Sequence, residues 1–221
     1  IVNMHPLPNT TFAGTGYDMG TFMSKQLKLG AVRDFALETY DQEKPLNYDE
    51  DNVATCYLDP DGWTIHRKRA WTTLFCGAHY DMIDFSILPR RETGTEESQR
   101  GIRTWMGHLS QFIHSVDLAR ARPLRDWLRA TTDDTIASAL AVEGEDYCIY
   151  LADGRELDQD GWGEKICGSV EMDLPDGEYR VSCYGPATGM YSPNVRVAGG
   201  RGTSLELPVF QHDLVVRIRR A

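Results

Sequence analysis

The feature that most constrains the fold is a change in rhythm near Pro123. Before it, short apolar stretches alternate with long segments whose apolar residues recur at helical spacing, as in successive strand–helix units around a parallel sheet. After it, short apolar stretches follow one another with Gly, Pro and Asp between them, which is typical of an antiparallel β-sandwich. We therefore predict two domains, residues 1–130 and residues 131–221.

Both domains can be divided into expected elements. In the first, we expect strands at 1–4, 44–48 and 79–87, and helices at 19–40, 64–76 and 96–118. In the second, we expect seven strands, at 137–142, 147–151, 169–174, 178–184, 194–197, 204–208 and 213–219. The predicted fold class is therefore α/β followed by all-β.

The charge balance narrows the range of partners. The chain has 23 Lys and Arg against 33 Asp and Glu, a formal net charge of -10. Beyond Ala130 the count is 8 basic against 16 acidic residues, so the excess of acid lies mainly in the second domain. Such a charge repels nucleic acid and anionic lipid, and no apolar stretch reaches the roughly 18 residues of a membrane span. We expect no nucleic-acid or membrane partner, whereas a neutral sugar remains compatible.

The cysteines do not indicate a metal or redox site. Their number is five, they are widely separated, and they form neither a CxxC pair nor a zinc-finger spacing with His. Cys148 and Cys183 lie in expected strands and could pair in an oxidising compartment or both remain reduced. We expect no cofactor and no metal.

Polar residues gather where the expected strands of the first domain end. His5 follows the first strand, Asp49 and Glu50 follow the second, and Tyr80 and Asp84 lie along the third. A carboxylate held at a rigid strand end is what a glycosidase needs to attack or stabilise an oxocarbenium-like centre. The alternative interpretation is an acidic turn that is simply solvated.

Several segments resemble one family in the same order along the chain. Residues 44–51 (KPLNYDED) resemble the segment that ends barrel strand seven in cellulase-like glycoside hydrolases, and residues 77–87 resemble strand eight. His5-Pro6 is similar to the end of strand six, and residues 176–189 are similar to the β-sandwich that follows such barrels. The resemblance implies the C-terminal part of a (β/α)8 TIM barrel followed by that sandwich.

The same resemblance implies an activity. It assigns Glu50 as the nucleophile of a retaining O-glycosidase that acts on a polysaccharide or oligosaccharide. The expected substrate-binding residues are His5, Tyr48, Asp49, His79, Tyr80 and Asp84. In this family the general acid lies on strand four, to which nothing in the chain corresponds. Because the chain also begins at Ile1 within an expected strand, we expect a fragment truncated at its N-terminus and inactive by itself.

Three alternatives stay open at this point. The chain could be a non-catalytic carbohydrate-binding protein, in which the second domain carries recognition, or that domain could only cap the barrel. His5, Asp49, Glu50, His79 and Asp84 could also form a metal site with oxygen and nitrogen ligands, but no pair has the spacing that fixes two ligands on one element. We favour a secreted or periplasmic location.

Overall fold

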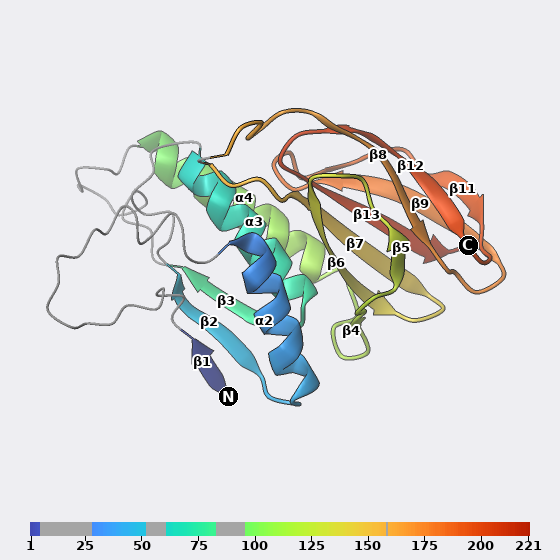
Figure 1. The fold of residues 1–221 in the computed structure, drawn as a ribbon, viewed down its shortest axis with the longest axis horizontal. Helices are drawn as coiled ribbons and strands as arrows, with labels where there is room; N and C mark the ends of the chain where they lie inside the picture. Colours follow the sequence, from blue (N-terminus) through green and yellow to red (C-terminus); the bar gives the residue numbers. More distant parts are fainter. Residues whose placement is uncertain (5–27, 52–60, 83–95, 158) are drawn as a thin grey trace, which may run out of the picture. The chain divides into compact units, whose positions relative to one another are not determined.

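The chain folds into two units, seen in the computed structural model of Figure 1. The structure describes residues 1–4, 28–51, 61–82, 96–157 and 159–221. The first unit comprises Ile1–Met106 with Glu156–Gln159, and the second comprises Gly107–Arg155 with Asp160–Ala221. His5, Asp84 and the first part of the expected helix 19–40 lie outside the described residues.

The first unit contains a parallel sheet whose strands are separated by helices. Its order is β1-β2-β3, with β1 at Val2–Met4, β2 at Leu46–Asp51 and β3 at His79–Met82. Helix α2 (Leu29–Asp41) precedes β2, and helix α3 (Asp61–Phe75) precedes β3. Consecutive strands are neighbours in the sheet, as in a βα barrel. The α/β class predicted for this part is confirmed.

Helix α2 covers one face of this sheet (Figure 1). Its Val32 and Ala36 pack in one cluster with Leu46 and Tyr48 of β2 and with Ala78 before β3. Successive side chains of a strand point to opposite faces, so Leu46 and Tyr48 share the helix-facing side of β2. The apolar spacing of this segment is therefore explained by the α2–sheet contact.

Helix α3 is buried along almost its whole length. Every residue from Trp63 to Thr73 is buried, including the basic run His66, Arg67, Lys68 and Arg69. The Arg67 guanidinium lies over the Trp105 ring of helix α4 (Glu96–Ile113), 3.9 Å from its centroid, and Trp105 meets Trp63 edge to face. A cation over an aromatic face is a favourable way to bury a guanidinium.

The second unit consists of two antiparallel sheets. The larger has the order β10-β9-β13-β7-β6-β4 with β11 also paired to β9, and the smaller has the order β12-β8-β5. The strands are β4 (Arg122–Pro123), β5 (Leu128–Ala130), β6 (Thr135–Val142), β7 (Asp146–Asp153), β8 (Ile166–Met172), β9 (Glu178–Gly185), β10 (Met190–Tyr191), β11 (Val195–Ala198), β12 (Thr203–Phe210) and β13 (Asp213–Arg220).

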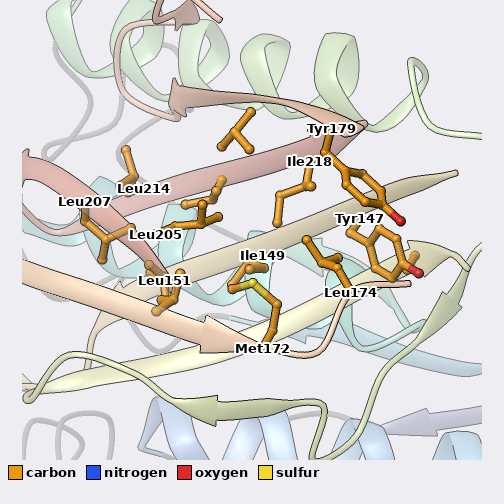
Figure 2. Packing of buried hydrophobic residues seen from close by; sticks show 14 of the residues in the cluster. Tyr147, Ile149, Leu151, Met172, Leu174, Tyr179, Leu205, Leu207, Leu214 and Ile218 are labelled. Atoms are coloured by element: carbon orange, nitrogen blue, oxygen red, sulfur yellow. The ribbon is translucent and has the colours of Figure 1, made fainter. Parts of the chain in front are cut away.

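One hydrophobic core lies between the inner faces of these two sheets. Figure 2 shows residues of β7 and β13, among them Ile149, Leu151 and Ile218, packed with Met172 of β8 and Leu205 of β12. The first three are fully buried, and the alternation of buried and exposed residues along β12 places its apolar side on this core.

The boundary between the units differs from the prediction at Ala130. Strands β4 and β5 lie before residue 131 and already belong to the sheets of the second unit. Helix α4, expected to continue to Leu118, ends at Ile113, where both the amide and the hydroxyl of Ser115 donate to the Phe112 carbonyl and close the last turn. No helix in the described ranges, α4 included, is long and apolar enough to cross a membrane.

The four cysteines within the described residues are free thiols. Cys148 lies on β7 and Cys183 on β9, and β13 runs between these two strands. The disulfide that the sequence left open is therefore not formed, because the strand order separates two residues that periodicity alone placed only in similar strands.

Candidate functional site

The carboxyl ends of β2 and β3 lie side by side in the parallel sheet. Asn47 is in register with His79, and Tyr48 with Tyr80. The polar residues at the ends of the two strands therefore meet at one edge, which is where functional groups collect in parallel α/β folds. Glu50 lies in β2 next to its end, at Asp51; only the backbone of Glu50 is among the described atoms.

Tyr48 and Tyr80 both belong to the helix-facing side of this edge. The Tyr48 hydroxyl donates to the Val32 carbonyl of α2 at 2.9 Å, and its ring is fully buried against Phe35. The Tyr80 hydroxyl is 2.9 Å from Nδ1 of His66 on α3. Burial raises the pKa of Tyr48 above its ordinary value. Both hydroxyls thus hold a strand to a helix.

An ion pair lies beside these tyrosines. The Arg69 guanidinium of α3 donates to the Asp51 carboxylate, and the two side chains are 3% and 0% exposed. Burial alone would lower the pKa of Arg69, but the Asp51 carboxylate outweighs this and holds that pKa above its ordinary value. Burial raises the pKa of Tyr80 well above its ordinary value, and Asp51 raises it further. At neutral pH Arg69 is charged and both tyrosines are protonated.

A β-bulge lies in β2 between Tyr48 and Asp51. Tyr48 is in register with Tyr80 and Asp51 with Met82, so Asp49 and Glu50 together lie opposite the single residue Asp81. A bulge interrupts the strict alternation of side chains and bends the strand, and bulges are common at barrel rims and beside active sites. The interruption falls on the two residues that the sequence singled out.

The other expected site residues are distributed over both faces. His79 and Asp81 are exposed on the face opposite Tyr80, Asn47 lies in register with His79, and Asp49 is half-buried at the bulge. His79 is the first residue of β3 and lies opposite Asn47, whereas Asp49 lies beyond Tyr48 at the bulge. Tyr48 and Tyr80 face the helices. In the parts of the chain that are described, no group of three His, Cys, Asp or Glu side chains could hold a metal ion.

Sequence reasoning did not identify the supporting role of His66 and Arg69. Both belong to the basic run 66–69 within the expected helix 64–76, and basic residues are usually expected at the surface. The available signal was weak: large apolar residues occur on every side of that run, so no face of the helix is purely polar. A helix of this kind has to bury some of its cations against partners.

Comparisons with known proteins identify the fold. No protein-family model and no curated protein matches the chain. A solved glycoside hydrolase family 5 structure from Bacteroides vulgatus matches with a TM-score of 0.62 and 13% identity, over 87% of this chain and 45% of that one. The chain shares its fold with part of a glycoside hydrolase. A second structure, described as a glycoside hydrolase, gives a TM-score of 0.59 and 13% identity, over 99% of this chain and 51% of that one.

The matching structures are longer than this chain. The chain spans about half the length of the glycoside hydrolase structures that it matches. At 13% identity, the likeness establishes the fold and leaves the activity and the roles of individual residues to be argued from the site.

Proposed function

We propose that the chain forms part of a retaining glycoside hydrolase in which Glu50 is the nucleophile. The observation that carries the proposal is the backbone position of Glu50 near the end of the central strand of β1-β2-β3, in a fold shared with glycoside hydrolases. Strand ends at this edge of a βα barrel carry the catalytic groups in characterised barrel enzymes.

The chemistry follows from a carboxylate at that position. An oxygen of Glu50 attacks the anomeric carbon, the glycosidic C–O bond breaks, and the leaving oxygen takes the bonding electron pair together with a proton from a general acid. Water, which gives up a proton to that same group now acting as a base, then attacks the anomeric carbon of the resulting glycosyl ester and releases the Glu50 carboxylate. The general acid would have to lie about 5 Å from Glu50. We propose that it comes from outside these 221 residues.

Neighbouring residues have supporting roles in this proposal. Asp49 and His79, with His5 and Asp84, would bind sugar hydroxyls, since hydroxyl groups are recognised by carboxylates and imidazoles. Tyr48 and Tyr80 are assigned a structural role instead, because their hydroxyls interact with Val32 and His66. The two-sheet second unit would be the β-sandwich that accompanies barrels of this kind.

Covalent trapping tests the proposal without requiring the general acid. A 2,4-dinitrophenyl 2-deoxy-2-fluoroglycoside has a leaving group that departs as a stable phenolate, so the glycosyl ester can form when no acid is present. The chain, and any longer protein of which it is part, is incubated with the β-glucoside, β-mannoside, β-xyloside and β-galactoside of this type. Mass spectrometry should find one added fluorosugar on the peptide that contains Glu50.

Variants make the assignment specific. Glu50→Gln should abolish labelling, because an amide oxygen is a poor nucleophile, while the matched change Glu38→Gln on the exposed side of α2 should leave it intact. Labelling at another carboxylate, or labelling that survives Glu50→Gln, would overturn the assignment. Failure of all four probes with both proteins would favour a non-catalytic carbohydrate-binding protein.

A further inference from the structure

Three arginines form a row across the outer face of the seven-stranded sheet. Arg196 of β11 is directly opposite Arg180 of β9, and Arg180 is directly opposite Arg219 of β13. Residues paired in this way point to the same side of an antiparallel sheet. We call Arg180, Arg196 and Arg219 the arginine row; β11, β9 and β13 are adjacent in Figure 1.

The core residues next to the row show which face it occupies. Tyr179, Val181 and Ile218 alternate with the arginines along β9 and β13, and all three lie in the core between the two sheets. Alternation therefore places the arginine row on the opposite side of the larger sheet. All three residues are exposed, and the Arg196 side chain is 81% exposed.

The row is poorly neutralised by the protein itself. Glu178 lies 3.8 Å from Arg196 and is 70% exposed, and Asp146 of β7 is the register neighbour of Arg219 but binds Arg217. No ion pair is found for Arg180 or Arg219 within the described ranges. Arg217, two residues before Arg219 on the same strand, shows the contrast: it is 3% exposed and binds Asp146 at 2.6 Å. Like charges directly opposite each other destabilise a strand pair.

The arginine row lies in a part of the chain that is otherwise rich in acidic residues. The segment beyond Ala130 has twice as many acidic as basic residues, yet three of its 8 basic residues occupy adjacent register positions. Since they neither pack in the core nor form strong internal pairs, their repulsion is relieved when an anion lies across them. A guanidinium binds a carboxylate through two parallel hydrogen bonds, which favours a carboxylate-bearing ligand.

We propose that the arginine row binds an acidic polysaccharide through the carboxylates of its uronic acid residues. Neighbouring strands are about 4.8 Å apart, so the row extends over about 10 Å. A polyuronate carries one carboxylate on each sugar ring and thus presents a series of anions rather than one. The preference for anions comes from the row, whereas the choice of a carbohydrate rests on the proposed function. The net charge of -10 disfavours nucleic acid, whose charge density is much higher.

Binding of a defined acidic oligosaccharide tests this inference. The full chain is titrated with an oligogalacturonate of six rings by calorimetry at 20 mM and at 300 mM salt, with cellohexaose as the neutral oligomer and a short DNA duplex as the competing polyanion. We expect binding to the oligogalacturonate at low salt, weaker binding at high salt, and none to cellohexaose. Replacing Arg180, Arg196 and Arg219 together by glutamine should weaken binding about tenfold, as three exposed ion pairs would.

Matched variants separate the row from general electrostatics and from the candidate active site. Glutamine at Arg122, Arg125 and Arg201, three exposed arginines outside the row, removes the same charge and should leave the affinity within about twofold. Glu50→Gln should not change the affinity for the oligogalacturonate. The binding experiment and the trapping experiment are therefore independent, and the failure of one does not decide the other. Equal losses in both triple variants, equal binding of cellohexaose, or stronger binding of the duplex would overturn the proposal. Circular dichroism verifies that each variant is folded.

Discussion

Arg69 and Asp51 form a buried ion pair that joins helix α3 to the last residue of strand β2. Removing two charges from water is costly, and the pair recovers that cost only because the partners face each other. Asp51 directly follows Glu50 and closes the bulge at Asp49 and Glu50. The pair therefore fixes the backbone on one side of the residue proposed as the nucleophile.

Breaking this pair should destabilise the first unit strongly. Arg69→Met leaves the Asp51 carboxylate buried without its cation, and we expect the free energy of opening of β2 and α3 to fall by about 3–5 kcal/mol. Native-state hydrogen exchange of peptides from these elements measures it. Asp51→Leu combined with Arg69→Met should recover much of the loss because neither charge of this pair remains.

A surface pair provides the control for that experiment. Arg33 and Asp34 are in contact at 2.7 Å, but their side chains are 34% and 58% exposed. Arg33→Met should therefore change the opening free energy by no more than about 1 kcal/mol. Similar effects of Arg33→Met and Arg69→Met would show that burial does not give the inner pair its importance.

Two glycines of helix α4 should respond in opposite directions to alanine. A Cβ at Gly101 would lie 2.2 Å from the ring of Trp63, which is itself buried against Trp105, whereas a Cβ at Gly107 would meet nothing within 4 Å. Gly101→Ala should cost about 1–3 kcal/mol through overpacking. Gly107→Ala should stabilise the helix by about 0.5–1 kcal/mol, because alanine is the better helix former.

Hydrogen exchange of α4 amides in the two glycine variants measures both effects. If Gly101→Ala also stabilised the helix, the close approach of Trp63 would not be a real constraint.

The elements that sequence predicted well are those fixed by local periodicity. The last strand was expected at 213–219 and is found at Asp213–Arg220, because alternate apolar residues along it face one core. The features that sequence missed depend on non-local neighbours. The burial of Arg67 and Arg69 requires partners on other elements, and the separation of Cys148 from Cys183 follows from the insertion of β13 between β7 and β9.

Only part of the candidate site was predicted from the sequence. The sequence placed Glu50 just after a strand expected at residues 44–48, whereas β2 continues to Asp51 and includes Glu50. The bulge at Asp49 and Glu50 was not predicted, because an extra residue in one strand becomes visible only when the register with Met82 and Tyr80 is known.

The cysteines should differ sharply in reactivity. Burial raises the pKa of the Cys148 thiol above its ordinary value, and a nearby Asp146 carboxylate raises it further, so this thiol stays protonated and enclosed. Cys167 is exposed. Iodoacetamide at pH 8 should label Cys167 within minutes, Cys183 more slowly, and Cys148 only after denaturation, as followed by peptide mass spectrometry. Labelling of Cys148 at the rate of Cys167 in the folded chain would contradict the packing of β7.

Tyr48 should make the first unit sensitive to alkaline pH. Burial raises its pKa, so the folded state retains a proton that the unfolded state releases above about pH 10. Stability is therefore fully present below pH 10 and falls as pH rises, with Tyr48 contributing a loss of about 1 kcal/mol by pH 11. Tyr48→Phe removes this contribution, while at pH 8 it costs about 1 kcal/mol through the hydrogen bond to Val32.

Urea unfolding of both proteins at pH 8 and pH 11, followed by tryptophan fluorescence, tests the sign of this effect. The stability difference between wild type and Tyr48→Phe should shrink or reverse at pH 11, because only the wild type has to keep a proton on a buried phenol at residue 48. Tyr40→Phe, a change of the same size at a half-buried residue of α2, is the control for the loss of one phenol. If the wild type loses no more stability than Tyr48→Phe between the two pH values, ionisation of the Tyr48 hydroxyl costs no stability. The expected effect of its burial on the pH dependence is then wrong.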